Sequence, residues 1–348
     1  MKLKRITALI LAGALSVTVL TGCGINKDQV AATMKDQNVT LGVANFMCRY
    51  QQAMLEDQYK MYLGAEDIWS QSLGGDATME DNVKDSAMEQ LHEMYTLKAH
   101  MADYKIELTD EDKKAVKDAA KKFIEANSQA TLNEISADAE IVEEVLTLYT
   151  IQSKMRNAIE AEADMNVSDA DANMRGYSMV TISTAAHTDE DGNQTEYTDE
   201  EKKKLKEDAE KMASELKEAG ANLDTVASKY GHEVTSGTYG TDDTQLAEEV
   251  RKELDALKEG ETSGLIETEG ALYFVRLDKE TDKEATEQHR QTIINTRKSD
   301  KYQEVLSGWQ EKDGWKVKEK ALEKIVFKNS LTQTDPDAPA ETTDGTQQ

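Results

Sequence analysis

The sequence predicts an α+β protein in which a mostly helical, discontinuous domain surrounds a smaller inserted α+β domain. Apolar residues recur every three or four positions from Thr40 to about Asn173, a spacing typical of amphipathic helices, and this pattern resumes near Glu284. Between these stretches the pattern changes to segments rich in β-branched residues, in the order β-α-α-β-α-β-β. We therefore expect the chain to leave a helical domain and to return to it.

In the helical part, residues 30–34 are the first expected strand, residues 35–38 a turn, and Thr40 the cap of the first helix. The glycine-containing loop at residues 73–76 should end the next helical stretch. Further helices are expected from about Asp85, after Thr109 in a capping-box pattern, over residues 138–163, and from Ser168 as a short connection.

The insert should begin with a strand over residues 177–184. An amphipathic helix over residues 198–219 follows and is closed by Gly220. The remaining expected elements are a short helix at 223–230, a strand at 233–240, a helix at 246–257, and strands near 263–268 and 271–278. A long helix over residues 284–312 then leads back to the helical domain.

The first 22 residues have the pattern of a secretory signal. Three basic residues precede an apolar run of 15 residues (6–20), which is shorter than the roughly 20 residues that a spanning helix needs. Residues 20–23, Leu-Thr-Gly-Cys, resemble the lipobox of bacterial lipoproteins. This resemblance implies that Cys23 carries a lipid and anchors the mature chain on the extracytoplasmic face of the cell membrane. The alternative is an ordinary signal peptide with a chance cysteine.

The charge of the chain excludes nucleic acid as an ordinary partner. The chain has 41 basic and 68 acidic residues, and removal of the first 22 residues takes away three basic and no acidic ones, which changes the formal charge from −27 to −30. Such a chain repels phosphate backbones. The sequence has no phosphate-binding loop, nucleophile–base pair or metal-ligand spacing among its five histidines, so we expect no cofactor.

Three further segments are interpreted as having no chemical function. Cys48 lies in an apolar helical segment, which favours a buried core residue over a reactive thiol. The acidic residues 188–193 hint at a calcium loop, but their glycine is not at the sixth position that an EF-hand requires, so an acidic hairpin loop is preferred. Residues 329–348 contain both prolines and few apolar residues, which predicts a disordered tail.

Several phrases, in the same order along the chain, resemble those of PrsA-type foldase lipoproteins. VAATMKDQNVTLGVANF (30–46) and MEQLHEMYTLKAHMADYKIELTDEDKKAV (88–116) are similar to the SurA-like chaperone module of that family. YSMVTIST (177–184), GANLDTVASKYG (220–231) and LKEGETSGLIETEGALYFVRL (257–277) are similar to its parvulin-type peptidyl-prolyl isomerase domain. The resemblance implies a signal peptide (1–22), a SurA-like helical chaperone domain (23–170), a parvulin-like domain (174–282), a returning C-terminal helix (283–328) and the tail (329–348).

The residues that carry the chemistry of parvulins differ in this chain. Parvulins resemble one another in two strand histidines, a nearby Asp or Cys, and an aromatic wall of the proline pocket. The two histidine positions match Met179 and Tyr273, the acidic position matches Thr238, and the aromatic position matches Asp255. Asp255 also lies off the apolar stripe of its helix, which indicates a solvated position. The resemblance therefore does not by itself imply isomerase activity.

The resemblance implies an extracytoplasmic, membrane-anchored chaperone or foldase for secreted proteins, with unfolded or folding polypeptides as partners. Its parvulin-like domain would serve binding or structure. Two alternatives remain open: a peptidyl-prolyl isomerase with weak or atypical activity, and an envelope adaptor that binds one specific protein. Turnover of proline peptides distinguishes the isomerase from the other two, and promiscuity towards clients distinguishes the chaperone from the adaptor.

Overall fold

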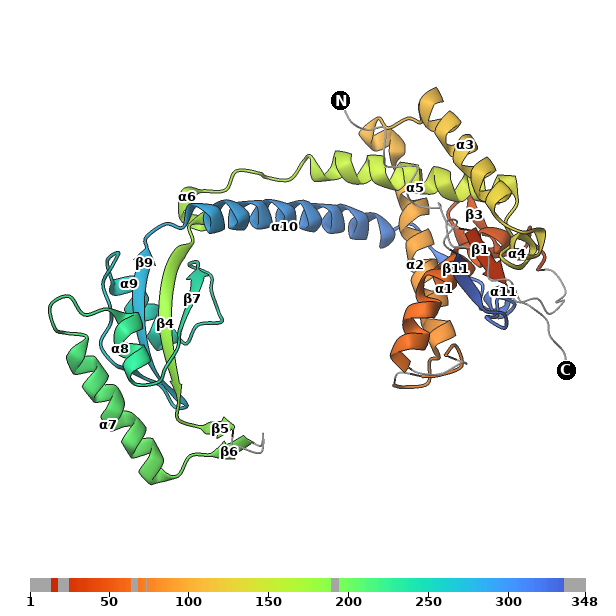
Figure 1. Ribbon diagram of the computed structural model, residues 1–348. Helices are drawn as coiled ribbons and strands as arrows, with labels where there is room; N and C mark the ends of the chain where they lie inside the picture. Colours follow the sequence, from red (N-terminus) through yellow and green to blue (C-terminus); the bar gives the residue numbers. More distant parts are fainter. Residues whose placement is uncertain (1–13, 18–24, 64–67, 73, 189–193, 335–348) are drawn as a thin grey trace, which may run out of the picture. The chain divides into compact units, whose positions relative to one another are not determined.

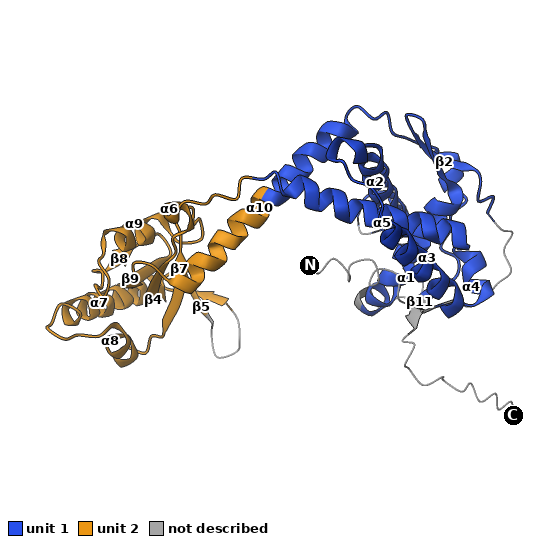
Figure 2. Ribbon diagram, turned by 90° about the horizontal axis from the view of Figure 1, so that it is seen from above, with its two compact units in different colours: residues 1–163, 298–348 blue, residues 164–297 orange. Residues whose placement is uncertain are grey.

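The computed structural model describes residues 14–17, 25–63, 68–72, 74–188 and 194–334. The chain forms two compact units, shown in different colours in Figure 2. The first unit comprises residues 1–163 and 298–348, and the second comprises residues 164–297. The predicted α+β class is confirmed, because the first unit is largely helical and the second is built on a four-stranded sheet.

The first unit is built mainly from helices whose ends are specified by local sequence. The side chains of Thr78 and Thr109 each accept a hydrogen bond from the backbone N–H of the aspartate three residues later. The carboxylate of that aspartate accepts a hydrogen bond from the backbone N–H of the threonine, which completes a capping box at both helices. The helices of this unit are α1 (Leu41–Leu63), α2 (Met79–Ala99), η1 (Met101–Tyr104), α3 (Asp110–Ala126), α4 (Gln129–Glu134), α5 (Ala139–Glu160) and α11 (Glu319–Leu322) (Figure 1).

Two small sheets complete the first unit. One has the strand order β10-β2-β3, from Lys316–Val317, Val30–Met34 and Gln37–Thr40. The other pairs β1 (Ala14–Val17) with β11 (Leu331–Thr334) in antiparallel fashion. Both sheets join an N-terminal strand to a C-terminal one, so the end of the chain belongs to the same unit as its beginning.

The core of the first unit is apolar and aromatic. Phe46 meets the Phe123 ring edge-on at 5.6 Å between centroids, and Trp69 meets Phe327 in the same way at 5.1 Å. Cys48 is fully buried, as predicted, and burial raises the pKa of its thiol to about 12. This thiol is a core residue rather than a nucleophile.

The second unit is a sheet with helices on both faces. The strand order is β7-β4-β9-β8, from Val234–Tyr239, Arg175–Ser183, Ala271–Lys279 and Ile266–Glu267. Helices α7 (Asp199–Glu215) and α8 (Leu223–Lys229) pack on one face, and α9 (Glu248–Ala256) packs on the other. The unit also contains α6 (Asp169–Ala172) and the hairpin strands β5 (Ala186–Thr188) and β6 (Gln194–Glu196).

One helix, α10 (Lys283–Gln310), contributes to both units. In the second unit the Thr286 hydroxyl accepts a hydrogen bond from the backbone N–H of Met174 at 3.0 Å. In the first unit Tyr302 is fully buried and its hydroxyl donates to Glu93 Oε1 at 2.5 Å. No helix among the described residues is long and apolar enough to cross a membrane.

Several sequence expectations are corrected by the structure. The turn expected at 35–38 is confined to residues 35 and 36, because residues 37–40 form β3 against β2. Residues 68–72 are not helical, α2 begins at Met79 rather than near Asp85, and the short helix α4 was not expected. The tail expected to be disordered from residue 329 contains β11, and the predicted signal segment contributes β1; residues 335–348 lie outside the described residues.

Candidate functional site

The candidate site lies on the sheet face of the second unit that α9 covers. Side chains alternate between the two faces of a strand, so Tyr177 and Met179 of β4 share this face with Tyr239 of β7 and Tyr273 of β9. We name these four residues the tyrosine face. Tyr273 is paired with Thr181, two positions beyond Met179, so Met179 and Tyr273 are diagonal neighbours. Both side chains are half-buried.

Glycine at position 237 allows two of these tyrosines to pack together. The Tyr177 and Tyr239 rings lie 6.0 Å apart between centroids at an interplanar angle of 65°. A Cβ atom at Gly237 would stand 2.7 Å from the Tyr177 hydroxyl oxygen, which is too close for any side chain. The absence of a side chain at Gly237 therefore positions Tyr177 across β7.

Asp255 is exposed but not merely solvated. Its carboxylate accepts hydrogen bonds from the Tyr239 hydroxyl at 3.0 Å and from Arg175 Nη1 at 3.3 Å. Arg175 also donates to the Tyr239 hydroxyl oxygen at 2.8 Å and to the Leu257 carbonyl at 3.1 Å. Burial raises the pKa of Tyr239, and the Asp255 carboxylate adds to this shift while Arg175 opposes it, so the phenol stays protonated and donates.

Thr238 lies apart from the other three matched positions. It is exposed on the edge strand β7, paired with Gly176, and it points to the face opposite Tyr239 because strand residues alternate. The structure thus brings Met179 and Tyr273 to one face and ties Asp255 to that face through Tyr239. It does not bring Thr238 to them.

The five histidines have partners elsewhere or lie away from the tyrosine face. His92 Nε2 lies 2.8 Å from Asp313 Oδ2 and its ring stacks on Trp315, while His100 bonds Asp103 and stacks on Trp309. His187 stacks on Tyr197, His289 Nδ1 lies 3.2 Å from the Ala172 carbonyl oxygen, and burial lowers the pKa of His232. Within the described ranges, no three His, Cys, Asp or Glu side chains are placed to hold a metal ion. Most of the acidic loop, residues 189–193, lies outside those ranges.

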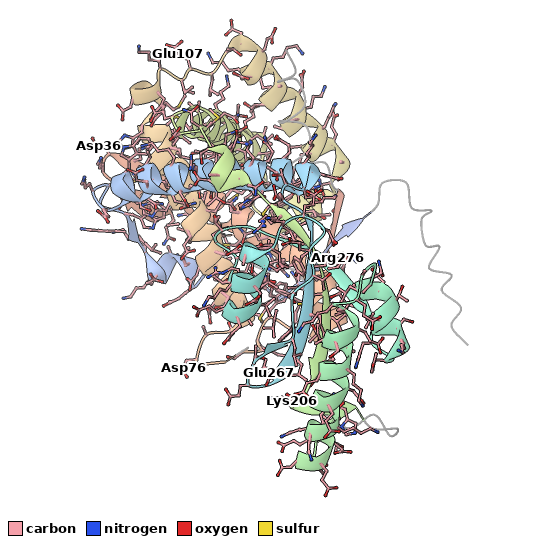
Figure 3. The ribbon with its side chains drawn as sticks, turned by 90° about the vertical axis from the view of Figure 1, so that its left-hand side faces the viewer. Asp36, Asp76, Glu107, Lys206, Glu267 and Arg276 are labelled. Carbon is pink, nitrogen blue, oxygen red and sulfur yellow. The ribbon has the colours of Figure 1, made fainter. Side chains whose placement is uncertain are left out.

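Two polar clusters were missed from the sequence. On the α7/α8 face, the Ser178 hydroxyl and Arg276 Nε each donate to Asp278 at 2.5 Å, and Arg276 Nη1 donates to Asp224 at 3.0 Å. These residues come from two strands and a helix, so no spacing along the chain indicates the cluster. In Figure 3 Arg276 is labelled, and Lys206 of α7 lies close to Glu267 of β8, with which it forms an ion pair of 2.7 Å.

The second missed cluster is buried in the first unit and lies along α1. Arg49, Gln52 and Glu56 are each at most 1 % exposed, and all three bond the segment 326–331. Their spacing of three and four residues, which places them on one face of the helix, is the sequence signal that could have indicated them.

A comparison with known families matches residues 186–290 to the PPIC-type PPIASE domain. No curated protein matches the sequence. Among solved structures, the foldase protein PrsA of Lactococcus lactis is 16 % identical, with 85 % of this chain and 97 % of that chain covered, at a TM-score of 0.34. The peptidylprolyl isomerase PrsA of Bacillus anthracis is 17 % identical, with 66 % of this chain and 99 % of that chain covered, at a TM-score of 0.26.

A structure described as a SurA-like chaperone of Campylobacter jejuni is 10 % identical, with 83 % of this chain and 98 % of that chain covered, at a TM-score of 0.28. All three TM-scores are below 0.5, so these superpositions do not establish a common overall arrangement. The family match over residues 186–290 agrees with the parvulin-type domain that the sequence resemblance predicts for this part of the chain.

Proposed function

We propose that this protein is an extracytoplasmic foldase chaperone, anchored to the membrane through lipid on Cys23, whose PPIC-type domain binds polypeptides without efficient isomerisation. The PPIC-type domain and the likeness to PrsA and SurA-like proteins support the chaperone or foldase part of this proposal. The observation that carries the second part is the tyrosine face, where Met179 and Tyr273 are neighbours at the positions that match the two histidines of parvulins.

The chemistry of these side chains favours binding over catalysis. Rotation about an X–Pro bond crosses a barrier of roughly 18–20 kcal/mol, and a catalyst lowers it with preorganised polar groups around a dry proline slot. The Met179 sulfur is only a weak acceptor, and a phenol cannot take the charge state of an imidazole near neutral pH. The Tyr239 hydroxyl on this face is already engaged by Asp255 and Arg175.

The chain from residue 24 onward is expected to accelerate cis-to-trans exchange of a proline tetrapeptide little or not at all. It should still suppress aggregation of a model unfolded protein, because holding an unfolded chain needs apolar surface and no proton transfer. The measurements are a coupled tetrapeptide assay against an active parvulin and light scattering of the unfolded protein. Tyr273→Phe, which removes only the hydroxyl, serves as the matched variant.

The two readouts separate the alternatives. Turnover comparable to that of active parvulins, lost in Tyr273→Phe or Met179→Leu, would promote the isomerase alternative. Failure to suppress aggregation of any of several unrelated clients, together with capture of a single envelope protein, would favour the adaptor.

Cys23→Ala is expected to leave the protein unprocessed or to release it from membranes, because no other cysteine follows the signal segment closely. One lipidated residue with two acyl chains is enough for stable anchoring, so its loss should be nearly complete. Fractionation and gel mobility of the expressed chain measure both effects, with Cys48→Ala as the control. Membrane retention and mobility identical to those of the wild type would contradict the anchor.

A further inference from the structure

The strand β1 occupies a defined position in the first unit. Its residues pair antiparallel with β11, with Leu15 opposite Gln333 and Val17 opposite Leu331. The Leu15 side chain is part of the apolar core and is only 4 % exposed. Figure 1 shows β1 beside β11 and near α4. Residues 14–17, within the segment that the sequence identifies as a signal peptide, thus pair as a strand of this unit.

Both edges of this strand are hydrogen-bonded. In a strand the N–H and C=O groups of one residue point to the same edge and those of the next residue to the other. One edge of β1 pairs with β11. On the other edge, the Leu15 N–H donates to Asn127 Oδ1 at 2.6 Å, and the Leu15 carbonyl accepts from the Thr131 hydroxyl at 3.3 Å. We name Asn127, Thr131 and β11 the strand site.

The two side chains of the strand site are held by their own helices. Asn127 Nδ2 donates to the Phe123 carbonyl at 2.7 Å, which turns its Oδ1 towards the strand. The Thr131 hydroxyl lies 2.9 Å from the Ser128 hydroxyl, at the start of α4. Asn127 is 8 % and Thr131 1 % exposed. Neither orientation depends on β1.

The β11 side of the strand site is also held independently of β1. The Leu331 N–H donates to Glu56 Oε2 at 2.9 Å, and Lys60 Nζ donates to the Ser330 hydroxyl at 2.9 Å. Both partners belong to α1. The start of β11 is therefore held by α1 as well as by β1.

We propose that, in the processed protein, the strand site binds an extended apolar segment of a client polypeptide in the position of Ala14–Val17. This inference rests on the proposed function, because cleavage before Cys23 is what removes β1. Cleavage leaves the Asn127 and Thr131 side chains and the edge of β11 open, so an incoming strand can form with them the hydrogen bonds that β1 forms. Main-chain pairing with one apolar side chain in the Leu15 position suits many clients, because it depends little on the amino-acid sequence of the client.

The test measures binding of a fluorescent peptide with the sequence of residues 11–20 by fluorescence anisotropy. The chain from residue 24 should bind it, and a peptide carrying Leu15→Asp should not. Thr131→Val and Asn127→Ala should each weaken binding by about fivefold, the loss of one hydrogen bond. Thr150→Val is the matched control, because Thr150 is another buried threonine whose hydroxyl bonds only the Leu146 carbonyl of its own helix among the described contacts.

The full chain, residues 1–348, provides a second measurement. Its own β1 fills the strand site, so it should bind the peptide at least about tenfold more weakly, because a tethered segment competes at high effective concentration. Leu15→Asp in the full chain should restore binding. Circular dichroism on every preparation checks that it is folded.

The proposal is overturned if the folded chain from residue 24 does not bind the peptide, or if Thr150→Val weakens binding as much as Thr131→Val. Aggregation suppression is measured on the same preparations. Suppression of aggregation without peptide binding would contradict the strand site but support the chaperone function. Peptide binding without suppression of aggregation of any client would contradict the chaperone function but support the strand site.

Discussion

Replacing Arg49 with leucine is expected to lower the free energy of unfolding of the first unit by about 3–5 kcal/mol, the usual cost of breaking a buried ion pair by removing one partner. The Arg49 guanidinium donates to Glu134 Oε1 at 2.9 Å and to the carbonyl oxygens of Val326 and Asn329 at 2.8 and 3.2 Å. Burial lowers the pKa of Arg49, and Glu134 opposes this shift. Leucine would leave these acceptors without their donor.

Tryptophan fluorescence is the appropriate measurement, because Trp69, Trp309 and Trp315 all lie in the first unit and therefore report its unfolding alone. Lys121→Leu is the control. Lys121 forms an exposed pair with Glu125 in the same unit, and such pairs contribute little to stability. Denaturant midpoints of Arg49→Leu and Lys121→Leu that coincide would contradict the role assigned to Arg49.

Replacing Glu56 with glutamine is expected to lower the free energy of unfolding of the first unit by about 1–3 kcal/mol at neutral pH. Glu56 accepts hydrogen bonds from the Leu331 N–H, from Gln52 Nε2 at 3.0 Å and from the Ser330 hydroxyl, and it pairs with Lys60 at 2.7 Å. Glutamine removes the charge and presents an NH₂ group to donors. Glu125→Gln, in an exposed pair with Lys121, is the matched control and should cause no measurable change.

The effect of Glu56→Gln depends on pH. Burial favours the neutral acid, but the hydrogen bonds from Lys60, Ser330 and Leu331 outweigh it and hold the pKa of Glu56 below its ordinary value of 4.5. A carboxyl with a lowered folded pKa contributes its stability fully above the unfolded value and loses it as the pH falls through the folded value. The difference in free energy of unfolding between Glu56→Gln and wild type should therefore be largest above pH 4.5 and should shrink below that pH. A difference that grows on acidification would contradict this assignment.

Local patterns in the sequence predicted much of the secondary structure, because the relevant interactions span only a few residues. The capping box at Thr109 and the strand at 30–34 were predicted from neighbours within four positions, and the structure has both. The resemblance of the insert to parvulins also predicted which strands carry Met179 and Tyr273. In each case the information lies within one element.

The candidate site was predicted only in part. The sequence indicated Met179, Thr238, Asp255 and Tyr273 by position, but not that Thr238 would face away from Tyr239 or that Arg175 would hold Asp255. Arg175 and Asp255 are 80 positions apart in the chain. Contacts over such separations depend on the register of the sheet, which no local pattern specifies.

The sequence by itself determined the α+β class, the starts of several helices, such as α3 after Thr109, the buried Cys48 and the positions that match the parvulin site. Only the tertiary structure decided that residues 331–334, polar enough to suggest a disordered tail, form a strand, and that Ala14–Val17 pair with it. The physical reason is that a short strand has too few contacts to form alone. β11 is ordered by Glu56 and Lys60, 275 and 270 positions away, and these partners meet only when α1 and the C-terminal segment have packed together.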